Sequence, residues 1–303
     1  MEKVEELVWK ESFNVGIDYI DEAHQKLFAV IRRVLRLVQA KDYMQNKQTC
    51  IEVIKFLEEY ALSHFAAEEE YQRSIGYEGY EMHKALHDNL TYVTLPQLEE
   101  ELKQMNFSQS AVEHLLSFLA GWLTGHILIE DRAITDRAES RWAKEHHLDK
   151  IEVIDHEFKQ FMSEFFGQTP KLINRHYSGE KTDKALYYNM EYKDENGELY
   201  DVIMFAEAPV VKFMISRMLG SDCKAIDHNN IGAYLELSRS CAHQALKFFD
   251  SGRQYVFSDH RAMKETELRE RFKGGFPHIS LLWRIEKGRL GFCIEHLPQK
   301  LPE

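Results

Sequence analysis

The chain lacks the cysteine pattern, the long apolar runs and the positive charge that mark several large classes of protein. Its four cysteines are scattered with no CxxC pair, so they predict reduced thiols rather than disulfides. No segment approaches the roughly 18 consecutive apolar residues of a membrane span, and the N-terminus has no apolar signal region. The formal net charge of −12 argues against sequence-independent binding of nucleic acid. We therefore expect a cytoplasmic protein with no nucleic-acid partner and no direct membrane association.

The first half of the sequence shows helical periodicity. The apolar stripes predict helices at 21–40, 47–73 and 77–103, and a fourth that begins after Ser108. Asp21 and Ser108 are suitable N-terminal caps, and Pro96 is expected to bend or break the third helix. Four helices with short connections favour an all-α, up-and-down four-helix bundle. A chain of 303 residues is long enough for two domains, and we predict the first at residues 1–145.

Strand signals appear only in the second half. The expected elements, in order, are a helix at 149–166, strands at 186–192 and 199–206 joined by an Asn196-Gly197 turn, helices at 209–220 and 230–249, a strand near 255–257, and a closing hairpin of 278–286 and 289–297. Helices mixed with antiparallel strands in this way predict an α+β domain at residues 150–300.

Histidines and carboxylates recur on the inward stripes of all four predicted bundle helices. They are His24, the HxxxE pair His64 and Glu68, the HxxxH pair His83 and His87, and the HxxxxD pair His126 and Asp131. Residues four apart share a helix face, so each of the first two pairs can serve one ion. A buried carboxylate such as Glu68 is costly unless it is paired or bound to metal. A lone histidine on such a stripe is usually a core residue, but the coincidence on four helices indicates a metal site.

The last pair departs from regular helical spacing. At about 100° per residue, positions five apart lie about 140° from one another on an ideal α-helix. His126 and Asp131 can therefore share a site only if the helix distorts or ends between them, which Gly125 and the acidic Glu130 favour.

These residues and their surroundings resemble the hemerythrin family, specifically its bacterial branch, from Trp9 through the stretch SFNVGIDYID to Asp131. The resemblance implies two iron ions joined by an oxo or hydroxo bridge, with an open position for dioxygen on one of them. By the same resemblance, one iron is bound by His83, His87 and His126, the other by His24 and His64, and both by Glu68 and Asp131.

The ligand types also favour iron and reversible binding. Di-iron bundles that activate oxygen use Glu-x-x-His pairs, and no Glu lies three residues before any His in this sequence. Zinc is the main rival, but structural zinc needs only four ligands, whereas imidazole and carboxylate together suit iron. Tyr71 and Trp122 lie beside the ligands and either line an oxygen pocket or belong to the core. His114, His146 and His147 lie outside the pattern and are interpreted as solvated.

The second half resembles the CheX branch of the chemotaxis phosphatases, which dephosphorylate response regulators, in the stretches EAPVVKFMISRMLG and GAYLELSRSCAHQALKFF. That family positions water with a Glu-x-x-Asn pair, and this chain has Glu236 and Arg239 instead. A guanidinium only donates hydrogen bonds, so Arg239 argues against catalysis. One interpretation is that the pair is an exposed ion pair that contributes little to stability. The other is that it is the degenerate catalytic pair of a phosphatase surface that still docks a receiver domain.

Together these features predict a non-haem di-iron, oxygen-binding protein that acts as an oxygen or redox sensor with a chemotaxis or two-component output, rather than as an enzyme. The expected partners are dioxygen, a response-regulator receiver domain and a second copy of the chain paired through a free sheet edge. Two alternatives remain open. The second half could be an active response-regulator phosphatase gated by iron, or the protein could store or scavenge oxygen and use that half only to dimerise.

Overall fold

The computed structural model of the protein describes residues 8–39, 43–135, 149–250, 253–274 and 277–297. The chain divides into two compact units, which are described separately. The first comprises Met1–Ala138 and Ile215–Leu237, and the second comprises Glu139–Met214 and Ser238–Glu303. The domain boundary predicted between 145 and 150 touches residues 136–148, which lie outside the described part, so it stays a prediction. The membership of 215–237 in the first unit was not expected from the sequence.

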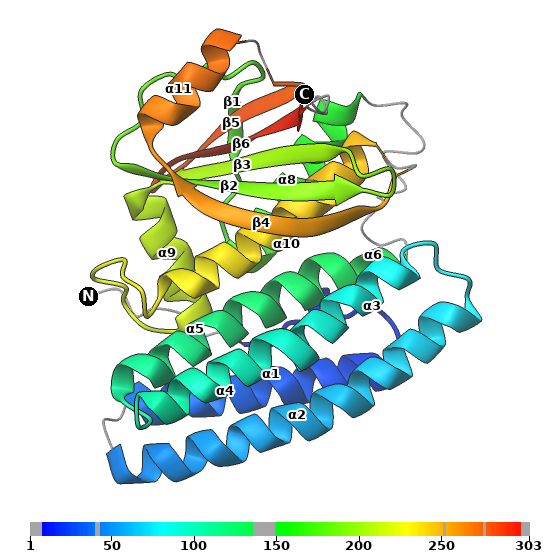
Figure 1. The fold of residues 1–303 in the computed structure, drawn as a ribbon, viewed down its shortest axis with the longest axis vertical. Coiled ribbons are helices and arrows are strands. Elements are labelled where there is room, and N and C mark those ends of the chain that lie inside the picture. Colours follow the sequence, from blue (N-terminus) through cyan, green and yellow to red (C-terminus); the bar gives the residue numbers. More distant parts are fainter. Residues whose placement is uncertain (1–7, 40–42, 136–148, 251–252, 275–276, 298–303) are drawn as a thin grey trace, which may run out of the picture. The chain divides into compact units, whose positions relative to one another are not determined.

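The first unit is built around the predicted four-helix bundle, whose α3 and α4 follow one another in a single line in Figure 1. A short 3-10 helix, η1 (Glu11–Phe13), comes first. The bundle elements are α1 (Asp18–Gln39), α2 (Tyr43–Ser74), α3 (Tyr80–Asn89), the π-helical turn η2 (Leu90–Thr94), α4 (Leu95–Gln104), α5 (Gln109–Gly125), the π-helical turn η3 (His126–Asp131) and α6 (Arg132–Ile134).

Local interactions set the ends of these helices. Ser108 caps α5 as predicted, because its Oγ accepts a hydrogen bond from the Ala111 N–H at 3.3 Å. Asp21 lies in the first turn of α1 rather than at its cap, and its carboxylate accepts the N–H groups of Val15 and Gly16 instead. Pro96 does not break the third helix. It lies in the first turn of α4, directly after the π-helical turn η2, and the backbone stays helical across the junction.

The segment Gln109–Ile134 is the one described helix that is long and apolar enough to cross a membrane by composition, because its most apolar 18-residue window has a mean hydropathy of 1.3. In the fold, 83% of its most apolar window is buried. Its apolar character is therefore explained by its place in the bundle core, which also contains the fully buried Phe28, Ile31 and Leu115.

The second unit contains a six-stranded sheet of order β1-β5-β6-β3-β2-β4 in which every neighbouring pair is antiparallel. The strands are β1 (Lys171–Asn174), β2 (Ala185–Asp194), β3 (Leu199–Glu207), β4 (Tyr255–Met263), β5 (Ile279–Ile285) and β6 (Gly288–Leu297). The helices of the second half are α8 (Lys150–Phe166), α9 (Ala208–Leu219), α10 (Ile231–Phe249) and α11 (Glu265–Gly274). This confirms the predicted α+β class, although β1 and α11 were not expected. Helices α9 and α10 each carry residues of both units.

Each face of the sheet has its own core. On one face, Leu268 of α11 joins a buried cluster that includes Tyr177 and Phe205. On the other, Trp283 donates a hydrogen bond to Asp155 of α8 at 2.7 Å, and its ring lies 4.6 Å from that of Phe158. Strand β4 forms one edge of the sheet, and most of its residues are exposed. Pairing of two chains through a sheet edge stays a prediction.

Candidate metal centre

The bundle brings all seven predicted metal ligands together in its interior. They are supplied by α1 (His24), α2 (His64 and Glu68), α3 (His83 and His87) and η3 (His126 and Asp131), and none exposes more than 5% of its surface. The apolar stripes that drive these helices together therefore carry the polar side chains inward with them.

The π-helical turn η3 solves the spacing problem of the last pair. A π-helix bonds residue i to residue i+5, so two residues five apart lie one turn apart on the same face. His126 and Asp131 are the first and last residues of η3, and His126 Nε2 lies 3.1 Å from Asp131 Oδ1. The distortion predicted between them is confirmed, and the helix continues into α6 instead of ending.

All five imidazole Nε2 atoms approach the two carboxylates. Around Glu68, the Nε2 atoms of His83, His64 and His87 lie 2.9, 3.5 and 3.7 Å from a carboxylate oxygen. Around Asp131, the Nε2 atoms of His126, His24 and His83 lie 3.1, 3.2 and 3.2 Å away. The mutual distances divide the donor atoms into two groups that share Glu68. The first group contains His24 and His64 beside Glu68. The second contains His83, His87 and His126 beside Glu68.

The contacts within this cluster fit metal ligation better than hydrogen bonding. Among the described residues, these buried atoms have no hydrogen-bond partner: both ring nitrogens of His24, His83 Nε2, Glu68 Oε2 and both oxygens of Asp131. His87 Nε2 and His126 Nε2 face each other at 2.9 Å. Nitrogen ligands about 2.1 Å from one transition-metal ion lie about 3 Å apart when they are adjacent. The donor atoms are therefore aimed at common points between them.

Burial keeps most of these imidazoles neutral. It lowers the pKa of His64 to about 4 and that of His126 to about 3, and it lowers the pKa of His87 well below its usual value. A neutral imidazole keeps the lone pair that a metal ligand needs.

His83 behaves differently from the other histidines. Burial lowers its pKa, but the charges of Glu68 and Asp131 outweigh burial and raise it to about 10. Burial likewise acts to raise the pKa of Glu68, yet the charge of His83 contributes to a pKa well below the usual value. Among the protein groups alone, His83 is thus a cation between two carboxylates, and a metal ion that binds there displaces its proton.

Four further residues support the ligands. Glu69 Oε1 lies 3.1 Å from His87 Nδ1, and Gln72, which is fully buried, donates from Nε2 to Glu68 Oε1 at 3.1 Å. Phe65 stacks on the His87 ring at 3.8 Å, and Trp122 stacks on the His126 ring at 4.3 Å. Such outer partners fix ring orientation and tune ligand strength.

Sequence reasoning identified one of these four supporting residues. Trp122 is buried and lies against the site, whereas Tyr71, the other aromatic considered, stays partly exposed. Gln72 could have been found from its spacing, since it lies one helical turn after Glu68 on the buried face. Nothing in the local sequence separates Glu69 from the exposed Glu70 beside it.

The predicted phosphatase pair lies elsewhere, one turn apart on α10. The Arg239 guanidinium lies over the Phe257 ring at 5.3 Å, and the Arg239 carbonyl accepts a hydrogen bond from Tyr192 Oη. Glu236 is partly buried. Neither contact reveals a catalytic role, so the assignment of Glu236 and Arg239 stays a prediction.

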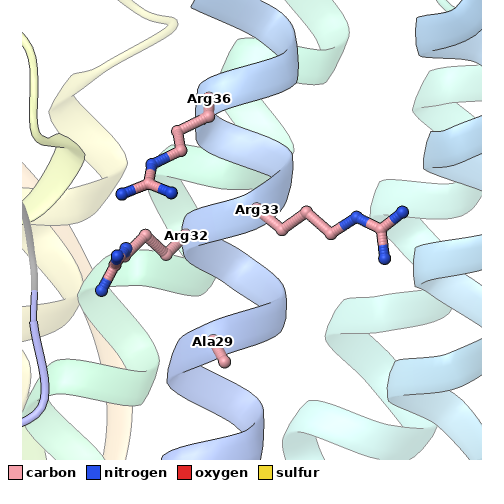
Figure 2. Close-up of a pocket in the computed structure, with 4 residues that line it drawn as sticks. All are labelled: Ala29, Arg32, Arg33 and Arg36. Atoms are coloured by element: carbon pink, nitrogen blue, oxygen red, sulfur yellow. The ribbon is translucent and has the colours of Figure 1, made fainter.

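An open surface pocket of about 430 Å³ on α1 is separate from the metal cluster. It is lined by Ala29, Arg32, Arg33 and Arg36 and by none of the seven ligands. Figure 2 shows Arg32 and Arg36 extending to one side of the helix and Arg33 to the other. The guanidinium groups that line this pocket are cations and cannot ligate a metal ion, so the pocket takes no part in the metal centre.

Comparison with known proteins gives matches for the first half of the chain. The profile of the Hemerythrin HHE cation binding domain family matches residues 15–138. Bacteriohemerythrin of Clostridium acetobutylicum is 34% identical over 131 residues, which are 43% of this chain and 98% of that protein. Bacteriohemerythrin of Stenotrophomonas maltophilia is 31% identical, over 46% of this chain and 88% of that protein. Myohemerythrin of Theromyzon tessulatum is 32% identical over 31% of this chain and 74% of that protein.

Solved structures give matches of a different kind. The chemotaxis protein CheX from Desulfovibrio desulfuricans aligns over 49% of this chain and all of its own, with 12% identity and a TM-score of 0.35. CheX from Vibrio vulnificus aligns over 49% of this chain and 97% of its own, with 9% identity and a TM-score of 0.36.

Proposed function

Because the chain belongs to the hemerythrin family, we propose that its helical bundle binds two iron ions and, through them, dioxygen. The observation that carries this proposal is the convergence of five imidazole Nε2 atoms on two buried carboxylates. Imidazole and carboxylate ligands in this number exceed what a structural zinc ion requires and suit a pair of iron ions. Such a pair supplies a redox-active centre at which dioxygen can bind reversibly.

The grouping of donor atoms supports a division of ligands between the two ions. His24 and His64 would hold one ion, and His83, His87 and His126 the other. Glu68 belongs to both groups of donors, and Asp131 approaches His24 with one oxygen and His126 with the other. Both carboxylates are thus placed to bridge. The ion with two histidines would have one protein ligand fewer and would therefore keep a free position.

The ligands are buried, which limits the access of water to the site and suits reversible binding. Phe65 and Trp122 cover the rings of His87 and His126, and both are buried. Neutral imidazoles also stabilise oxidised iron less than anionic oxygen ligands do. The chain therefore favours binding and release of oxygen over oxidation of a substrate.

The test is metal analysis combined with absorption spectroscopy of the full chain. We expect about two irons per chain, as in other di-iron bundles, and a ligand-to-metal charge-transfer band that appears under air and disappears on removal of oxygen. A colourless protein that takes up no iron after anaerobic reconstitution with ferrous salt would contradict the proposal.

Replacement of Gln72 by leucine is expected to weaken iron binding by about 10–100-fold, because an outer partner of a ligating carboxylate is lost. Gln72 is fully buried and donates to Glu68, four residues before it. The matched control is Gln104→Leu, since Gln104 donates to Glu100 with the same spacing on the exposed surface. Competition with a chelator measures the iron affinity of both variants. Equal affinities would show that Gln72 does not position Glu68.

We also propose that the state of the iron site is passed on as an oxygen or redox signal through α5 to α10. Helix α5 carries Trp122 beside the site and also contacts the start of α10 within the first unit. Ser117 Oγ donates to the Asn230 carbonyl at 2.7 Å and accepts the Ala233 N–H at 2.9 Å. Helix α10 continues to Arg239, on the face proposed to dock a response-regulator receiver in the cytoplasm. Such coupling requires different oxygen affinities in the two output states.

A further inference from the structure

We propose that Glu101, His114 and His228 form a second metal site, on the surface, for a divalent transition-metal ion such as zinc. The three residues come from α4, α5 and the turn before α10, all in the first unit. Their ligand atoms lie within 4.8 Å of one another. None of the seven interior ligands takes part, so this site is independent of the iron proposal.

The distances suit coordination by two imidazoles and one carboxylate. His114 Nδ1 lies 3.1 Å from both oxygens of Glu101, the separation expected for adjacent ligands on one ion. His228 Nε2 lies 4.0 Å from Glu101 Oε1. Because 74% of the His228 side chain is exposed, it can rotate to close the remaining gap.

Hydrogen bonds made by the two residues after His228 hold this turn next to α5, so the position of His228 does not depend on a bound metal ion. Its neighbour Asn229 accepts a hydrogen bond from Ser110 Oγ at 2.6 Å and donates to Glu113 at 3.4 Å, and the next carbonyl, of Asn230, accepts from Ser117. The two imidazole rings lie beside each other, with centroids 4.3 Å apart and a tilt of 31° between their planes.

Simple ion pairing does not account for the arrangement. A surface pair of histidine and carboxylate contributes well under about 1 kcal/mol, and Glu101 already pairs with the nearer His114. A metal ion gives all three side chains a shared partner. Two imidazoles and one carboxylate form a known zinc ligand set that leaves the fourth position to water. Nitrogen ligands also select zinc, cobalt or copper over magnesium and calcium.

Occupation of the site would tie the turn before α10 to α4 and α5. That turn leads directly into the residues whose backbone contacts Ser117 of α5. A bound ion would therefore hold α5 and the start of α10 together from the outside.

The test titrates the iron-loaded full chain with cobalt(II), whose visible absorption reports tetrahedral coordination. We expect one cobalt ion to bind at this site, to be displaced by zinc, and to leave the iron content unchanged. His228→Ala and Glu101→Gln should each weaken cobalt binding by about tenfold or more. His260→Ala removes an exposed histidine on β4 and should leave it unchanged.

Two outcomes would overturn the proposal. One is a lack of tetrahedral absorption with the wild-type chain. The other is equal cobalt affinity for wild type, His228→Ala and Glu101→Gln, which would mean adventitious binding elsewhere. Because iron is measured in the same samples, failure at this site is distinguished from failure of the interior iron centre.

Discussion

Glu68→Gln is expected to abolish iron binding, the largest effect of any single substitution in the bundle. Both oxygens of Glu68 face imidazole nitrogens, and the residue belongs to both groups of donor atoms. An amide has one carbonyl oxygen and no negative charge, so it cannot bridge two cations. We expect iron per chain to fall close to zero and the affinity to fall by more than the roughly 100-fold typical of an outer-shell loss.

The matched control is Glu70→Gln, the same chemical change on an exposed position of α2. Iron per chain after anaerobic reconstitution should be unchanged in this control. Circular dichroism separates loss of ligand from loss of fold, because the carboxylate also compensates the buried charge of His83. Full iron content in a folded Glu68→Gln variant would rule out the proposed bridging role.

Gly121→Ala is expected to destabilise the first unit by about 2 kcal/mol. A Cβ at Gly121 would lie 2.6 Å from Ala233 Cα, so backbone rather than a flexible side chain must move. Overpacking of this kind costs about 1–3 kcal/mol. We expect a cost near the upper end of this range, because the added atom meets backbone. Alanine recovers about 1 kcal/mol through its better helix propensity. Urea denaturation measures the resulting free energy of unfolding.

Gly232→Ala is the matched control from the opposite side of the same helix contact. A Cβ there would meet the Phe118 nitrogen at 3.4 Å, an ordinary contact distance, so this variant should be neutral or slightly more stable. If α5 and α10 carry the oxygen signal, Gly121→Ala should also change the oxygen dissociation rate, whereas Gly232→Ala should not. Equal stabilities and equal rates in the two variants would remove the support for this route.

The features predictable from the sequence are those with a local period. The bundle helices follow from their apolar stripes, and the interior cluster follows from ligands placed on those stripes at steps of three and four. The His126–Asp131 step predicts a distortion, but the form it takes, a π-helical turn, depends on packing that the local sequence does not contain.

The missed features have weak local patterns or depend on distant contacts. Strand β1 has only four residues, and α11 is rich in charged residues with few apolar positions. His114 was expected to be solvated, yet only 20% of its side chain is exposed because Glu101 and His228 lie beside it. The inclusion of 215–237 in the first unit depends on long-range contacts with α5 and could not be derived from periodicity.

The π-helical turn between His126 and Asp131 links the number of residues in this stretch, more than the identity of those between the two ligands, to the form of the backbone. Ile127, Leu128 and Ile129 can be exchanged for other aliphatic side chains of similar volume. Deletion of any one of them would return the backbone to ordinary helical spacing and shift every later residue by one position. A homologous segment with one residue fewer would therefore place the carboxylate four residues after the histidine, where an ordinary α-helical turn already brings both side chains to one face.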